Sequence, residues 1–117
     1  MNFEEPMQRL LEDCPEAQSA AIVDPDGIPV VVMPREGSLE TLGAELAAIL
    51  RDLAEAAREF QHGHLEQCSV FAEDAVIILT TINAGYFLIL VMNRDGLAGK
   101  GRFQSRLTGA RLYSEFI

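Results

Sequence analysis

The sequence predicts a mixed α/β fold, a single domain over residues 1–117 with the element order α-β-β-α-β-β-β-α. Stretches in which apolar residues recur at helical spacing alternate with short runs rich in Val and Ile, and turns containing Gly, Pro, Asn or Asp separate these runs. The length of 117 residues, with 49% apolar and 23% charged, is that of one ordinary globular domain. One hydrophobic core is therefore expected.

The first helix is predicted over residues 3–13. Asn2 and Glu5 have the spacing of a capping box, and Pro6 falls in the first turn, where no backbone donor is lost. Pro15 ends the helix. Its apolar face, which should lie against a sheet, consists of Phe3, Met7, Leu10 and Cys14.

A β-hairpin follows, with strands over residues 18–24 and 28–33. The turn from Asp24 to Gly27 suits a hairpin because the aspartates can bond their own backbone and Gly27 can adopt a positive φ. Pro29 cannot donate a hydrogen bond to a ladder, which places the second strand at a sheet edge.

A long helix is predicted to begin after Ser38, a good N-cap, and to run to about Gln61, with Gly63 as its C-terminal stop. One face should pack on the sheet. This face consists of Leu39, Leu42, Leu46, Ile49, Leu50, Leu53, Ala57 and Phe60.

The flank of the long helix is smooth. It carries Ala44, Ala47, Ala48 and Ala54 beside Arg51 and Glu55. Small side chains would let a second helix approach closely, but alanine is also the best helix former on any exposed surface. From the residues alone, both interpretations stay open.

Three strands in a meander are predicted over residues 65–73, 75–82 and 86–92, followed by a helix over residues 98–115. Phe103, Leu107, Ala110 and Ser114 fall in line on that helix. The apolar stretch that ends at residue 92 is almost long enough to span a membrane, but polar residues interrupt its middle and its Val and Ile favour strands, so no membrane insertion is expected.

The net charge is −9, with 18 acidic and 9 basic residues, which disfavours binding to nucleic acid or to anionic lipid. The charge is uneven: residues 99–117 have a local charge of +3, which leaves −12 for residues 1–98. Cys14 and Cys68 lack metal-ligand spacing and are interpreted as core residues. With no basic and apolar signal segment at the amino terminus, a reducing cytoplasm is expected.

No catalytic, cofactor or metal site is predicted, and the chain is not expected to be an enzyme. The glycine-rich segment 96–101 lies between a strand and a helix, but it lacks the spacing of a nucleotide-binding loop and the hydroxyl that would hold magnesium. His62 and His64 flank the carboxyl end of a helix, where a partly cationic imidazole interacts favourably with the negative end of the helix dipole. Asp24 and Asp26 are interpreted as turn formers.

The element order, the hairpin at residues 20–30 and the later stretch at residues 76–91 resemble the Roadblock (dynein light-chain type) family. The resemblance covers nearly the whole chain. It implies a five-stranded antiparallel sheet of order 2-1-5-4-3, with the two terminal helices on one face and the long middle helix on the other.

The resemblance further implies a homodimer in which the middle helices pack together and the third strands pair edge to edge. The residues expected at this contact are Ala44, Ala47, Ala48, Arg51, Glu55, Cys68, Ser69, Val70 and Phe71. Family members are platforms, and the gliding-motility type stimulates hydrolysis by a partner GTPase. The expected function is a homodimeric platform that binds and regulates a small Ras-like GTPase.

Two alternatives stay open. The first is a structural adaptor in a larger assembly that makes no contact with a GTPase. The second is a small-molecule sensor domain, since compact α/β sheets of similar outline often enclose ligands. The sensor is disfavoured because no polar cluster interrupts the apolar faces.

Overall fold

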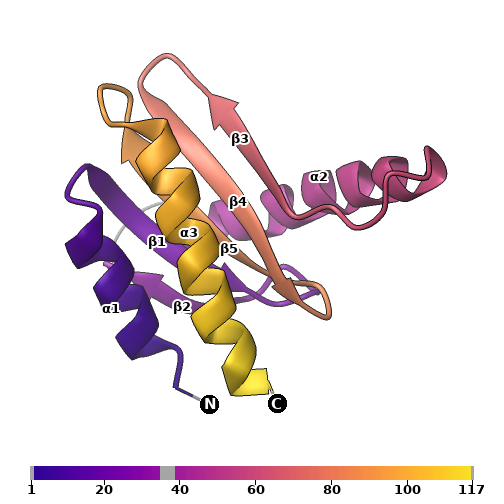
Figure 1. Ribbon diagram of the computed structural model, residues 1–117, viewed down its shortest axis with the longest axis horizontal. Coiled ribbons are helices and arrows are strands. Elements are labelled where there is room, and N and C mark those ends of the chain that lie inside the picture. Colours follow the sequence, from indigo (N-terminus) through magenta and orange to yellow (C-terminus); the bar gives the residue numbers. More distant parts are fainter. Residues whose placement is uncertain (1, 35–38, 117) are drawn as a thin grey trace.

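A computed structural model describes residues 2–34 and 39–116 of the chain (Figure 1). Within these residues one sheet of five antiparallel strands has the order β2-β1-β5-β4-β3. The strands are β1 (Ala17–Val23), β2 (Pro29–Met33), β3 (Gln67–Phe71), β4 (Ala75–Asn83) and β5 (Tyr86–Asn93). The helices are α1 (Glu4–Asp13), α2 (Leu39–Glu59) and α3 (Ala98–Tyr113), and a 3₁₀ turn at Ser114–Phe116 follows α3. The predicted fold class and strand order are confirmed.

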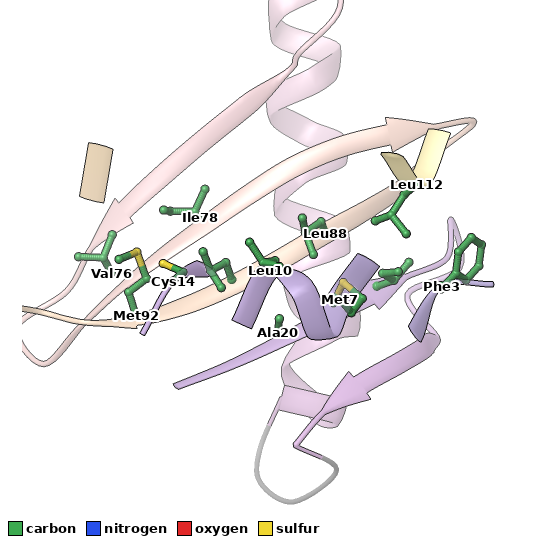
Figure 2. Packing of buried hydrophobic residues seen from close by; sticks show 12 residues of the cluster. Phe3, Met7, Leu10, Cys14, Ala20, Val76, Ile78, Leu88, Met92 and Leu112 are labelled. Carbon is green, nitrogen blue, oxygen red and sulfur yellow. The ribbon is translucent and has the colours of Figure 1, made fainter. Parts of the chain in front are cut away.

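The sheet has a hydrophobic cluster on each face. Helices α1 and α3 cover one face and α2 crosses the other (Figure 1). In Figure 2, Met7 and Leu10 of α1 lie against Leu88 of the sheet, with Leu112 of α3 at one end of the cluster and Met92 at the other. Burying each such side chain contributes about 2 kcal/mol.

Helix α1 buries the face that the sequence predicts: Phe3, Met7, Leu10 and Cys14. The capping box is only half formed. The Oδ1 of Asn2 accepts a hydrogen bond from the backbone N–H of Glu5 at 3.4 Å, but the N–H of Asn2 donates to Glu115 rather than to Glu5. The start of the chain is therefore tied to its carboxyl-terminal end.

The β1–β2 hairpin confirms the predicted turn. Gly27 has a φ of +85°, and Oδ1 of Asp24 accepts hydrogen bonds of 2.9 Å from the backbone N–H groups of Asp26 and Ile28. Pro29 begins strand β2, which is an edge strand as predicted.

Helix α2 ends earlier than predicted, and Gly63 is not its stop. Gln61 takes the left-handed conformation with a φ of +60°. The N–H of Gln61 donates to the carbonyl of Arg58, and the N–H of His62 donates to that of Ala57. This pair of bonds is a Schellman motif with glutamine at the position that usually holds glycine. The predicted N-cap, Ser38, lies outside the described residues.

The predicted apolar stripe of α2 is only partly buried. Leu39, Leu46 and Leu50 are in the core, but Ile49 is 53% exposed, Leu53 44% and Phe60 73%. The prediction was wrong for these three residues. Ile49 is on a side of the helix turned away from the core, since its neighbour Leu50 is buried, and further along the helix is longer than the sheet beneath it. In Figure 1 the second half of α2 reaches past strand β3.

Helix α3 turns most of its large apolar residues away from the sheet. Phe103 is 54% exposed and Leu107 36%. The buried side is made of small residues, Gly101, Ser105, Thr108 and Gly109, with Leu112 at its end. Met92 and Ile78 of the sheet reach up to Gly101, so no large side chain fits between the sheet and that part of the helix.

Candidate interaction surface

Strand β3 is the outer strand of the sheet on the side opposite β2. Its side chains alternate between the two faces. Cys68 belongs to the cluster beneath α2, whereas Gln67 donates 3.0 Å hydrogen bonds to Oγ1 of Thr80 and to the backbone carbonyl of Arg102 on α3. The outward edge presents a row of backbone donors and acceptors, the usual template for pairing with another strand.

The two ends of β3 are exposed to different degrees. Cys68 and Ser69 are half-buried, while Val70 is 45% exposed and Phe71 55%. Val70 pairs with Ile77 of β4, on the face that α2 covers only in part. Phe71 lies on the other face, with the guanidinium of Arg94 at 5.3 Å from its ring centre.

The second half of α2 continues this apolar surface. We call Ile49, Leu53 and Phe60 the apolar flank of α2. The residues recur at helical spacing and leave their side chains exposed beside the open edge of the sheet. The helical spacing of these three residues is visible in the sequence, but from that spacing alone they were predicted to lie in the core.

Three of the residues expected at a dimer contact also contact their own subunit, and of these only Ala47 is buried, while Ala44 and Arg51 are exposed. Ala47 is buried in the core beneath α2. A Cβ added to Gly27 would lie 2.9 Å from Cα of Ala44, so the hairpin packs directly on this part of the helix. Nη2 of Arg51 donates a 2.9 Å hydrogen bond to the carbonyl of Pro25. Ala48 and Glu55 are exposed.

Both cysteines are free thiols. Burial raises the pKa of Cys14, which nearby Glu16 raises further and Lys100 lowers, and burial also raises the pKa of Cys68. Cys14 is a core residue as predicted, whereas Cys68 is only half-buried at the sheet edge. Raised pKa values leave both thiols protonated near neutral pH, which suits packing rather than nucleophilic chemistry.

The glycine-rich segment before α3 forms a turn and the first turn of the helix. The N–H of Gly96 donates to the carbonyl of Asn93, and Gly101, in the first turn of α3, is buried on the side of the helix that faces the sheet. Among residues 2–34 and 39–116 there is no group of three His, Cys, Asp or Glu side chains placed to hold a metal ion. In the same residues no helix is both long and apolar enough to cross a membrane.

A groove of about 610 Å³ separates the other flank of α2 from the β4–β5 hairpin. Arg51, Arg58 and His64 line it together with apolar side chains such as Leu50 and Leu65. This site was not predicted from the sequence. Its signal was available, because Arg51 and Arg58 are seven residues apart and therefore share one side of a helix.

Comparison with known proteins decides the family. A sequence model of the Roadblock/LC7 domain matches residues 4–93, which is most of the chain. The chain belongs to the Roadblock/LC7 family. Members of this family are mainly adaptors or regulators rather than catalysts. No curated protein matches the chain at a significant level.

Solved Roadblock structures have the same fold. A Roadblock/LC7 domain from Streptomyces avermitilis is 20% identical, with a TM-score of 0.86 and coverage of 99% of this chain and 98% of that one. MglB of Myxococcus xanthus is 14% identical, with a TM-score of 0.88 and coverage of 97% and 94%. MglC of the same organism is 27% identical, with a TM-score of 0.70 and coverage of 98% and 99%. The Roadblock fold is thus common to all three.

Proposed function

We propose that this Roadblock chain is a homodimeric cytoplasmic platform that binds and regulates a small Ras-like GTPase. The observation that carries the proposal is the apolar flank of α2 beside the open edge of β3. Ile49, Leu53 and Phe60 are each more than two-fifths exposed in a single subunit. An exposed apolar patch of this kind next to an unpaired strand favours a protein contact.

The geometry supports pairing between two copies. If the β3 strands of two subunits pair antiparallel, one sheet continues through the dimer. The second half of α2, which reaches past β3 (Figure 1), would then lie over the partially covered face of the other subunit, near Val70 and Ile77. The two apolar flanks would meet between the paired helices, a self-complementary contact about a two-fold axis.

The residues expected from the family resemblance divide between two roles in this dimer. Ala48 and Glu55 on the exposed side of α2, and Cys68 to Phe71 on β3, would contact the other subunit. Ala44, Ala47 and Arg51 would act within their own subunit, since they fix α2 on the core and on the β1–β2 hairpin.

The similarity in fold to the gliding-motility protein MglB supports the part of the proposal that concerns regulation of a GTPase. The platform would supply no catalytic group. It would instead bind more tightly to the GTPase conformation that the terminal phosphate orders, and would stimulate hydrolysis by repositioning the GTPase's own residues. Because two subunits build the surface, splitting the dimer should abolish GTPase binding.

Calorimetry with candidate small GTPases tests the proposal. Each GTPase is loaded with a non-hydrolysable GTP analogue or with GDP and titrated with the wild type and with Ile49→Glu, which places a charge on the apolar flank. We expect binding by the wild type alone, tighter in the triphosphate state. Phosphate release with GTP, with and without the platform, measures stimulation.

Two outcomes would contradict parts of the proposal. Equal affinity for both nucleotide states would leave the structural adaptor as the better explanation. Undiminished binding by a monomeric Ile49→Glu variant would show that the dimer is not the binding unit.

A further inference from the structure

The groove between α2 and the β4–β5 hairpin has an unusual charge. The chain as a whole carries 18 acidic and 9 basic residues, yet none of the described residues that line the groove is Asp or Glu. Arg51, Arg58 and His64 converge on it. Basic side chains gathered in one cleft attract an anionic group. Because no carboxylate among the described residues lines the cleft, none of them repels that group from close by.

The rest of the lining is apolar or uncharged. Leu50 and Phe87 are buried at its base, and Leu65 is half-buried. A volume of about 610 Å³ is in the range of natural ligand sites. A groove with two arginines over an apolar base suits a ligand that carries both carboxylates and aliphatic side chains.

The spacing of the two arginines favours a peptide over a small anion as the ligand. Seven residues of α-helix place Arg51 and Arg58 about 10 Å apart along the helix axis. Side chains that extend in parallel from these two positions would hold two anionic groups about this far apart, which two carboxylates of one peptide supply and a single phosphate does not. A peptide in a polyproline conformation returns to the same side every three residues, after about 9 Å, so carboxylates three residues apart match the two arginines.

The groove lies on the side of α2 opposite the apolar flank, although Glu55, which would contact the other subunit, is only three residues from Arg58. Ile49 and Arg58 are nine residues apart, which is two and a half helical turns and places them on opposite sides of α2. Dimerisation through the apolar flank would leave the groove open. The inference therefore does not depend on GTPase binding.

We propose that the groove binds a partner's peptide segment in which acidic residues three positions apart alternate with aliphatic residues. Arg58 would bind one carboxylate. Arg51, which already donates to the carbonyl of Pro25, would bind the second carboxylate with its remaining donors. The base formed by Leu50, Leu65 and Phe87 would receive the aliphatic side chains.

The test uses the full chain labelled with ¹⁵N and titrated with the blocked hexapeptide Asp-Pro-Leu-Asp-Pro-Leu. We expect amide shifts confined to the groove, at Leu65, Asn83, Ala84 and Gly85, and weaker binding as salt screens the charges. The peptide with Asn in place of Asp should bind at least about tenfold more weakly, which is the value of one or two charge-assisted hydrogen bonds.

Two charge-neutralising variants complete the experiment. Arg58→Gln should weaken binding about five- to tenfold, whereas the matched Arg106→Gln, an exposed position on α3, should leave it unchanged. Equal binding of the Asp and Asn peptides, or equal losses in both variants, would overturn the proposal. So would inorganic phosphate that reproduces the same shifts at the same concentration, since the site would then be one for small anions.

Discussion

At the scale of single residues, the close approach of α3 to the sheet depends on glycine. A Cβ added to Gly101 would lie 2.9 Å from Cδ1 of Ile78 and would overlap Sδ of Met92, both of which are fully buried. Glycine is thus required at this position for packing, although it is a poor helix former. The same close approach explains why the buried side of α3 consists mainly of small residues.

We predict that Gly101→Ala destabilises the protein by up to about 2 kcal/mol, because overpacking typically costs about 1–3 kcal/mol and alanine regains about 1 kcal/mol of helix propensity. Gly99→Ala is the matched control. A Cβ there would meet only the end of the Arg102 side chain at 3.6 Å, so stability should be unchanged or rise by up to about 1 kcal/mol. Urea unfolding measures both. Equal stability of the two variants would contradict the packing described for α3.

At the scale of elements, the carboxyl end of α2 is a cap built with an unfavourable residue. Gln61 occupies the left-handed region, at a φ of +60°, and its side chain is exposed. A residue with a Cβ is strained there by roughly 1 kcal/mol, whereas glycine is not. The helix nevertheless ends here because two backbone hydrogen bonds close the motif.

We predict that Gln61→Gly raises the free energy of unfolding by about 1 kcal/mol. Gln61→Ala, which removes the same side chain but keeps the Cβ, should have no such effect. Thermal unfolding followed by circular dichroism compares the two. A gain of similar size in both variants would mean that the glutamine side chain, rather than backbone conformation, is responsible.

At the scale of the whole molecule, the surface that is open on the α2 side should be closed by a second copy. Light scattering of the wild type at tens of micromolar should return twice the 12.9 kDa of one chain. Ile49→Glu should return the single-chain mass, since a carboxylate would have to be buried without a partner. Ala48→Arg should act in the same direction by holding the helices apart.

Phe103→Glu is the control for this prediction. Phe103 is 54% exposed and Ile49 53%, so the two substitutions remove similar apolar surface and add the same charge on opposite faces of the sheet. The dimer should survive Phe103→Glu. A single-chain mass for the wild type, or equal dissociation by both variants, would exclude the apolar flank as the contact.

The sequence by itself determined the local elements. Three features depend on interactions within a few residues: the apolar stripe of α1, the turn from Asp24 to Gly27 and the edge position of Pro29. The spacing and type of neighbouring residues are therefore enough to predict them. The family resemblance supplied the strand order. It also correctly placed the long helix alone on its face of the sheet.

Only the tertiary structure decided which side of a helix is covered, because that depends on what lies opposite. Periodicity aligned Phe103 with Leu107 correctly but could not show that Met92 and Ile78 already fill the space beneath α3. It likewise grouped Ile49 and Leu53 with Leu50, although only Leu50 is buried against the sheet. The groove of Arg51 and Arg58 is the same case. Its second wall comes from a hairpin some 25 residues further along the chain, and burial and charge at such a site depend on chain segments that no local pattern brings together.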